Sequence, residues 1–124
     1  MPCKKDTYRT GRLYERLSAW YLRLKGYHVV AQNFKVGRGT GAGEIDLIVQ
    51  KGKILVFVEV KRRPTFREAI EAITLQNQMR VVRSSGVFLK KNTQFRTCLI
   101  RYDALLWQAG TWGPKHIQNA WRVL

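Results

Sequence analysis

Two apolar segments of this 124-residue chain carry charged side chains within them: Glu44 and Asp46 in the first, Glu59 and Lys61 in the second. A carboxylate among Ile, Leu and Val is costly unless it is paired or binds a metal ion. The whole chain has only 8 Asp and Glu against 23 Lys and Arg, and three of these acids fall in the two segments. This concentration indicates a functional site.

The chemistry that these side chains favour is metal-dependent hydrolysis of a phosphodiester. Mg²⁺ (or Mn²⁺) takes oxygen ligands, polarises a phosphoryl oxygen and lowers the pKa of an attacking water. Asp46 and Glu59 would supply two ligands, and the backbone carbonyl of Val60 a third. Lys61 would hold the water and counter charge on the phosphorane. Glu15 could reach the metal, directly or through water, if its helix packs over these strands.

The two segments, roughly residues 44–50 and 54–61, are expected to form an antiparallel hairpin. Lys51-Gly52 between them favours a tight turn, because Gly accepts a positive φ. The hairpin would form the centre of the fold.

The register of this hairpin decides whether the site exists. A two-residue turn at Lys51-Gly52 pairs Gln50 with Lys53, so that the numbers of opposite residues sum to 103. Asp46 is then diagonal to Glu59. Any odd sum places Asp46, Glu59 and Lys61 on one face of the sheet, because side chains alternate with period two. An even sum would send Asp46 to the other face.

The other expected elements follow from apolar periodicity and from turn residues. The predicted order is αβββαβ, a mixed α/β layer in a single domain spanning residues 1–124, with residues 1–10 as a flexible basic tail. The elements are a helix over 11–25 that ends at Gly26, a strand over 27–31, the hairpin, a short helical turn over 66–73, a long helix that Thr74 caps, a strand from 97 to about 107, and a helix or strand over 116–121.

The first of these helices carries two apolar stripes. Glu15 shares one of them with Ala19 and Leu22 and lies nearly opposite the other. We therefore expect this helix to be covered on two sides. The other stripe consists of Leu13, Leu17, Trp20 and Leu24.

Composition favours a nucleic-acid partner. The formal charge is +15, spread along the chain, and such a field suits a polyanion that crosses a broad surface. No apolar run reaches a membrane span, and two cysteines do not make a disulfide framework. The basic first residues are not followed by an apolar h-region, so we do not expect a secretory signal. We expect a cytoplasmic protein that does not bind membranes. Phosphate contacts are expected from Arg12, Lys35, Arg38, Arg62, Arg63 and Arg80.

The spacing of Asp46 and the Glu59-x-Lys61 motif resembles the metal motif of the PD-(D/E)XK nuclease superfamily. Within this superfamily, the chain most resembles the YraN-like family of predicted bacterial endonucleases, which is related to Holliday-junction resolvases. The resemblance spans nearly the whole chain. The matching positions are Gly11 with Glu15, Gly26-Tyr27, Gln32-Asn33, residues 43–48 and 56–63, Glu71-Ala72-Ile73-Thr74, Arg101-Tyr102-Asp103 and residues 116–120.

The resemblance implies a restriction-endonuclease-like αβββαβ core and a Mg²⁺-dependent endonuclease acting on DNA, selective for branched or recombination-intermediate DNA. It makes Asp46 and Glu59 metal ligands, Lys61 the catalytic lysine and Glu15 an auxiliary acid. Glu44 could be a second ligand, a substrate-facing residue or a solvated strand end, and we expect a supporting role for it and for Gln78. Junction resolvases act on two symmetric strands, so a homodimer is expected if that analogy holds.

Several positions depart from the family pattern. Ile45 replaces the Pro of the superfamily name, Tyr14 stands where Gly is usual, and Asn77 stands where Lys is usual in the second long helix. Asn77 supports the alternative of a non-catalytic nucleic-acid-binding protein on a degenerate nuclease fold. A third alternative is a basic partner of another repair or RNA-processing factor.

Overall fold

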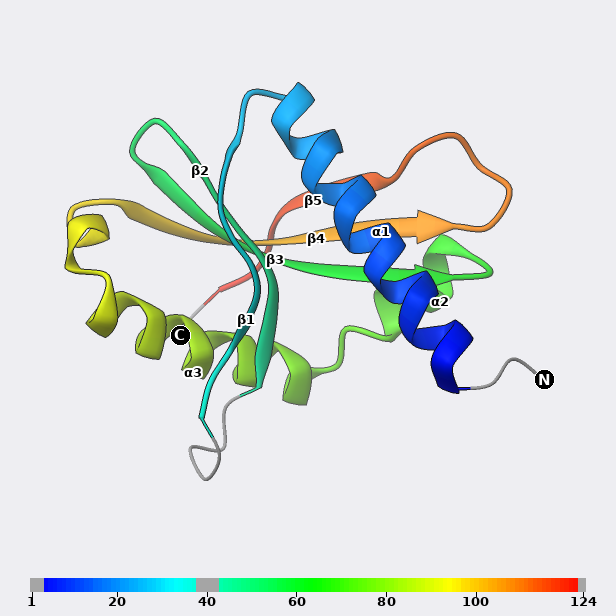
Figure 1. Cartoon of the computed structure of the whole chain (residues 1–124), viewed down its shortest axis with the longest axis horizontal. Coiled ribbons are helices and arrows are strands. Elements are labelled where there is room, and N and C mark those ends of the chain that lie inside the picture. Colours follow the sequence, from blue (N-terminus) through cyan, green and yellow to red (C-terminus); the bar gives the residue numbers. More distant parts are fainter. Residues whose placement is uncertain (1–3, 38–42, 123–124) are drawn as a thin grey trace.

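The computed structural model, which describes residues 4–37 and 43–122, has an antiparallel hairpin at its centre (Figure 1). Its strands are β2 (Glu44–Lys51) and β3 (Ile54–Arg63). Both are rich in Val, Ile, Leu and Phe, which fit a sheet surface covered on both sides. The predicted hairpin is confirmed.

The register of the hairpin differs from the prediction by two. Gln50 pairs with Leu55 rather than with Lys53, so opposite residues sum to 105. The loop consists of Gly52 and Lys53, and Gly52 has φ +59° at the first loop position, where two-residue hairpin turns often place Gly. The sum stays odd, so the shift keeps the face that the prediction assigned to Asp46.

Three further strands complete a mixed sheet in the order β1-β2-β3-β4-β5. Only the β3–β4 pair is parallel, and the two helices α2 and α3 lie in the connection between these strands. The mixed sheet confirms the predicted fold class, and the last element is a strand. The bounds are β1 (His28–Lys35), α2 (Phe66–Glu71), α3 (Leu75–Lys91), a 3₁₀ turn (Thr93–Phe95), β4 (Leu99–Gln108) and β5 (Lys115–Trp121).

Helices cover both faces of the sheet. Ala19 and Leu22 of α1 (Lys4–Leu24) belong to an apolar cluster on one face, and Val81 and Phe88 of α3 belong to a cluster on the other. In the described parts of the chain, none of the helices combines the length and the apolar character needed to cross a bilayer.

Local signals for the helix ends are confirmed. The Thr74 hydroxyl accepts a hydrogen bond from the Asn77 amide at 3.2 Å and caps α3. Gly26 has φ +94° and ends α1, with the Tyr27 amide donating back to the Leu22 carbonyl.

The start of α1 was predicted wrongly. The helix begins at Lys4, so residues 4–10 are helical backbone and not the expected tail. The apolar periodicity starts only at Leu13, which is why the earlier turns gave no signal. Residues 4–10 contain neither Pro nor Gly, so nothing in them interrupts a helix.

Only one of the two apolar stripes of α1 packs on the sheet. Ala19 and Leu22 are buried, together with Ser18. The other stripe points away from the sheet and is exposed to solvent. Among the described residues, none covers this second side of α1, so the expectation that the helix is covered on two sides is wrong there. The exposed fractions are 52% for Leu13, 40% for Leu17, 62% for Trp20 and 86% for Leu24.

A buried carboxylate joins β4 to β5. Asp103 receives two hydrogen bonds from the Arg101 guanidinium, both 2.8 Å long, one from His116 Nε2 at 2.7 Å and one from the Asn119 amide at 2.9 Å. Arg101 also donates to the Tyr27 hydroxyl at 2.6 Å, which connects β4 to the residue before β1. Burial alone would raise the pKa of Asp103, but the hydrogen bonds from His116, Arg101 and Asn119 lower it overall.

Candidate metal centre

The sheet opens where the two strands of the hairpin diverge. The pairing of β2 with β3 ends at Leu47 and Val58. Beyond this pair, β2 stays with β1 as far as Glu44, and β3 stays with β4 as far as Arg63. The start of β2 and the end of β3 therefore separate, as Figure 1 shows. The gap gives side chains of both strands access to one space.

Asp46 bridges this gap. Its Oδ2 accepts a hydrogen bond from the backbone amide of Val60 at 2.8 Å, so the carboxylate takes the place of a main-chain acceptor from β2. Glu59 is 8% exposed, and its Oε1 lies 3.1 Å from Lys61 Nζ. The structure thus brings Asp46, Glu59 and Lys61 close together, as predicted, although the register of the hairpin differs from the prediction by two.

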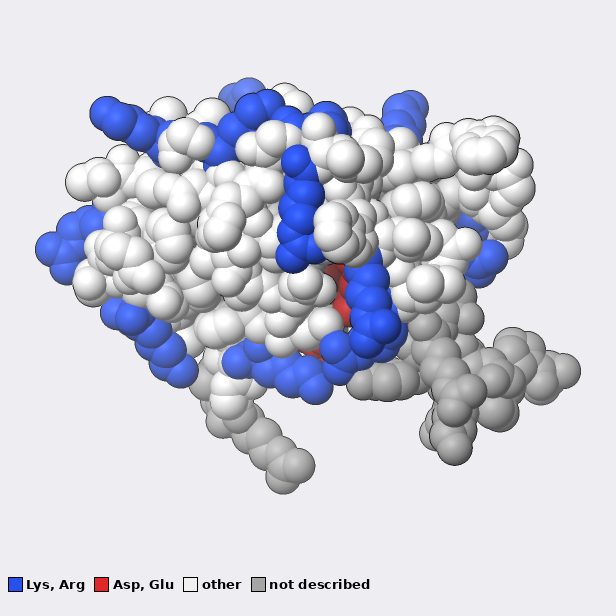
Figure 2. Space-filling view, turned by 45° about the horizontal axis from the view of Figure 1, so that its top comes forward, with Lys and Arg blue, Asp and Glu red and all other residues white. Residues whose placement is uncertain are grey.

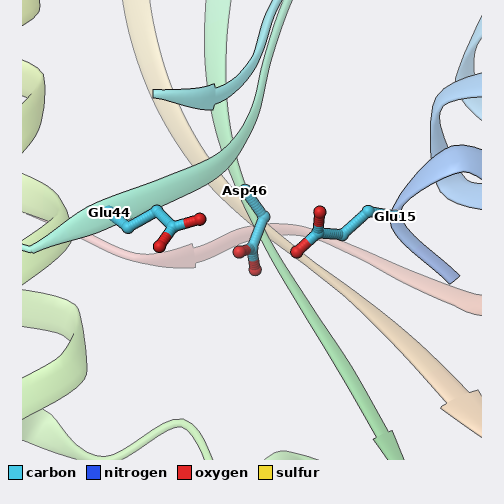
Figure 3. A group of neighbouring side chains, drawn as sticks. All are labelled: Glu15, Glu44 and Asp46. Carbon is cyan, nitrogen blue, oxygen red and sulfur yellow. The ribbon is translucent and has the colours of Figure 1, made fainter. Parts of the chain in front are cut away.

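Two more carboxylates approach Asp46. Glu15 comes from α1 and Glu44 from the first position of β2, and one oxygen of each lies within 4.8 Å of the others and of an Asp46 oxygen. Figure 3 shows the three side chains pointing toward one another from the helix and the strand. The Asn33 side chain of β1 hydrogen-bonds Glu15. Glu44, for which a supporting role is expected and a ligand role is the alternative, lies within 4.8 Å of Asp46, as Glu15 does.

These acids line one cleft with a volume of about 340 Å³. Basic side chains border it: Figure 2 shows acidic atoms at the bottom of an opening between Lys and Arg side chains. An anion that approaches the acids therefore passes cations first. The lining residues are Gly11, Arg12, Glu15, Asn33, Lys35, Glu44, Asp46 and Glu59.

Burial and mutual repulsion both raise the pKa values of the carboxylates in the cleft. The pKa of Asp46 is well above its ordinary value, first because burial penalises the charged form and then because Glu59 is negative nearby. Burial also raises the pKa of Glu59, against the attraction of Lys61, and the pKa of Glu15, against the hydrogen bond from Asn33. The folded protein thus holds these carboxylates close together at an electrostatic cost.

The donor set fits a hard divalent cation. Carboxylate oxygens are the ligands that Mg²⁺ and Mn²⁺ prefer. Glu15 Oε2 is buried and has no hydrogen-bond partner in the described parts of the chain, although buried polar atoms are normally paired. A cation among Glu15, Glu44 and Asp46 would satisfy this oxygen and neutralise the repulsion. The residues present therefore fit a metal ion.

The predicted phosphate contacts lie at different distances from this cleft. Arg12 and Lys35 line it. Arg62 and Arg63 are exposed at the end of β3, and the Arg62 guanidinium lies over the Tyr14 ring, 4.8 Å from its centroid.

The remaining predicted residues sit farther along the chain. Arg80 lies near the start of β2, beside Gly43. The Arg80 Cβ is 3.6 Å from the position that a Cβ added to Gly43 would take. Gln78 lines a different groove, between α3 and Trp121, and is not brought to the cleft. Arg38 lies outside the described residues, as do residues 39–42.

Sequence reasoning gave no role to Asn33, which the structure places in the cleft. It has φ +53°, a left-handed conformation that Asn adopts more readily than most residues. This turn of the backbone within β1 accompanies the hydrogen bond of its side chain to Glu15. The available signal was the Gln32-Asn33 pair, which is among the positions that match the family pattern.

A mixed sheet with helices on both faces, and carboxylates gathered where a central hairpin splits, define an α/β protein with a nuclease-like, restriction-endonuclease-like core. The chain belongs to the uncharacterised protein family UPF0102, whose sequence profile matches residues 14–106. This is the YraN family of PD-(D/E)XK nuclease-like proteins, so the resemblance inferred from the motifs is confirmed.

Relatives match over most of their length. The chain is 42% identical to a UPF0102 protein of Paramagnetospirillum magneticum over 116 residues, 93% of this chain and 88% of the relative. It is 41% identical to one of Parvibaculum lavamentivorans (93% and 83% covered) and 38% identical to one of Bartonella tribocorum (92% and 83% covered).

Proposed function

We propose that this protein is a metal-dependent DNA endonuclease that acts in the cytoplasm on branched DNA, such as recombination or repair intermediates. The observation that carries the proposal is the convergence of Glu15, Glu44 and Asp46 in the gap of the split hairpin, with Glu59 beside them on the adjacent strand.

The residues divide the chemistry among them. Glu15, Glu44 and Asp46 would hold Mg²⁺ or Mn²⁺, and Glu59 lines the same cleft. The ion, when bound, polarises a phosphoryl oxygen and lowers the pKa of water. Lys61, held by Glu59, would hydrogen-bond the attacking water and offset negative charge growing on the phosphoryl group.

Charge supports a nucleic-acid substrate. The chain has a formal charge of +15, and Arg12 and Lys35 stand in the wall of the cleft itself. Contacts of this kind go to phosphates and carry no sequence information, which suits recognition by DNA shape. Selectivity for branched DNA remains the part of the proposal that comes from the relationship to junction resolvases.

A second candidate function has one specific observation in its favour. The side-chain amide of Asn77 donates a hydrogen bond to the backbone carbonyl of Ala72 at 2.9 Å. The family pattern has a lysine at this position. A protein without that cation could bind nucleic acid through its basic surface and not cleave it.

The decisive experiment is cleavage of labelled linear, flap, single-stranded and four-way-junction DNA with Mg²⁺, Mn²⁺ or EDTA. Wild type, Glu59→Gln and the charge-matched control Glu68→Gln would be compared; Glu68 is exposed on α2 and does not line the cleft. The proposal expects metal-dependent cutting by wild type and Glu68→Gln and none by Glu59→Gln. If no variant cuts and all bind DNA equally without metal, the binding protein replaces the enzyme.

A further inference from the structure

A closed set of contacts fixes the side chain of Tyr14 in α1. The Ser18 hydroxyl donates a hydrogen bond to the Tyr14 carbonyl at 2.6 Å and accepts one from Trp107 Nε1 at 2.8 Å. The Trp107 ring in turn meets the Tyr14 ring edge to face, with their centroids 5.2 Å apart. The contacts thus return to the residue from which they started, and they hold the Tyr14 ring in one orientation.

The fixed ring lies under the guanidinium of Arg62. The central carbon of this group is 4.8 Å from the ring centroid, a distance at which a cation is attracted to an aromatic face. Arg62 is also the partner of Trp107 where β3 pairs with β4, and Figure 1 shows α1 passing across these two strands. The sheet and the helix therefore hold in place a long side chain that would otherwise sample many rotamers.

The hydrogen-bond donors of Arg62 stay available to a ligand. Its side chain is exposed, and in the described parts of the chain no oxygen accepts a hydrogen bond from its guanidinium. Lys25, Lys51 and Arg101 also lie over tyrosine rings, but each is already held by a hydrogen bond within the protein. Stacking fixes the plane of the Arg62 guanidinium and leaves N–H groups at its edge, which suit two oxygens of a phosphate.

The place of this pair in the chain indicates which phosphate it meets. Tyr14 precedes Glu15 in α1, and Arg62 follows Lys61 in β3. Glu15 lines the acidic cleft, and Lys61 is held by Glu59, which lines it too. A nucleic-acid strand carries a phosphate at every nucleotide, so a strand with one phosphate at the cleft brings a neighbouring phosphate to Arg62.

We propose that Tyr14 is a positioning residue, which holds Arg62 as a clamp for a backbone phosphate next to the one at the acidic cleft. The inference rests on the proposed function for the identity of the ligand, a nucleic acid, but not on cleavage. It adds to the predicted phosphate contact of Arg62 the residue that orients it. Binding without metal therefore tests the clamp separately from the chemistry.

Fluorescence anisotropy of a labelled DNA duplex in EDTA measures this binding. We expect Arg62→Ala to bind at least about tenfold more weakly, because charge-assisted hydrogen bonds are lost. Its slope of log K against log salt should be shallower by about 0.9, the contribution of one phosphate contact. Tyr14→Leu keeps an apolar side chain against Trp107 but has no aromatic face, so we expect binding about threefold weaker or more. Tyr14→Phe keeps the face and should bind as wild type does.

A double-mutant cycle separates positioning from a general loss of structure. In an Arg62→Ala background, Tyr14→Leu should cause no further loss, because no guanidinium is left to position. Tyr21→Leu is the matched control. Tyr21 lies on the same helix, and the ammonium group over its ring, that of Lys25, is already hydrogen-bonded to His116. We expect this control to bind as wild type does.

The outcomes distinguish the clamp from the enzyme. Tyr14→Leu that binds as wild type does overturns the clamp, as does a loss that is equally large in the Arg62→Ala background. Wild type that binds no DNA overturns both the clamp and the proposed function. Wild type that shows the expected coupling but never cleaves DNA supports the clamp and refutes the endonuclease alone. Circular dichroism checks that each variant is folded, and Tyr14→Met replaces Tyr14→Leu if the latter is not.

Discussion

Asp46 accepts a hydrogen bond from the backbone amide of Val60 across the gap between β2 and β3. One carboxylate therefore does two things: it replaces a missing main-chain acceptor in the sheet, and it contributes an oxygen to the acidic cleft. These two roles respond differently to substitution, which allows them to be separated.

Asp46→Asn should abolish metal binding and leave the fold intact or more stable. The Asn carbonyl can still accept from Val60, and the substitution removes a buried charge next to Glu59. Asp46→Ala leaves the Val60 amide unpaired, so we expect it to be less stable than Asp46→Asn by about 1–3 kcal/mol. Urea unfolding of both variants gives the difference. Equal stabilities would show that the bond to Val60 contributes little.

Stability without metal should fall as the pH rises above the ordinary range of carboxyl groups. The pKa values of Asp46, Glu59 and Glu15 are raised in the folded protein above the ordinary values, which are 3.8 for Asp and 4.5 for Glu. At a pH between the ordinary and the raised values, the folded state therefore binds more protons than the unfolded state. The contribution of these groups is therefore largest at the acid end of that window and is lost as the pH rises through it. Chemical unfolding at a series of pH values checks this, and Asp46→Asn should have a flatter profile.

Added Mn²⁺ should reverse this loss at neutral pH. The ion binds the charged carboxylates of the folded protein, and an ion at 100 times its dissociation constant stabilises by about 2.7 kcal/mol. We expect wild type to gain thermal stability with Mn²⁺ and to lose the gain with EDTA, while Asp46→Asn gains none. An equal gain in both proteins would place the ion elsewhere.

Asn33→Gly should weaken metal binding with little effect on the fold. Gly adopts the φ of +53° without strain, but the hydrogen bond to Glu15 is lost. Asn33→Ala adds a backbone penalty of roughly 1–2 kcal/mol. Calorimetric Mn²⁺ titration and urea unfolding would be compared for the two variants. Metal affinity equal to wild type in Asn33→Gly would remove Asn33 from the site.

Asp103→Ala should be the most destabilising of these changes and should not act on the chemistry. It leaves Arg101 and His116 partly or fully buried without their acceptor, and breaking a buried pair in this way costs about 3–5 kcal/mol. Asp103 does not line the cleft, so under the proposed function the folded fraction of the variant should have the same cleavage activity as wild type. Unfolding curves measure the first effect, and cleavage rates normalised to folded protein measure the second.

Much of the fold follows from short-range features of the chain. Apolar runs around a turn glycine predict the hairpin, and Thr74 and Gly26 mark helix ends correctly. Because side chains alternate along a strand, these features also bring Asp46, Glu59 and Lys61 to one place in spite of a register error of two residues. An even error would have destroyed the prediction, and the loop chemistry alone did not exclude one.

Other features of the site depend on contacts between distant segments. Gln78 was assigned to the site and lies in another groove. Glu44 was also assigned to the site and does line the cleft, as does Asn33, to which no role was given. The position of each depends on how β1, β2 and α3 pack, and no local pattern reports this.

By itself, the sequence determined the central hairpin, the order of the elements except the type of the last one, the charge, and the acidic residues that line the cleft. The tertiary structure decided that β2 and β3 separate beyond Leu47 and Val58 and that α1 turns Ala19 and Leu22 toward the sheet. Periodicity shows that α1 has two apolar faces. It cannot show which one the sheet accepts, because that depends on the complementarity of surfaces far apart in the chain.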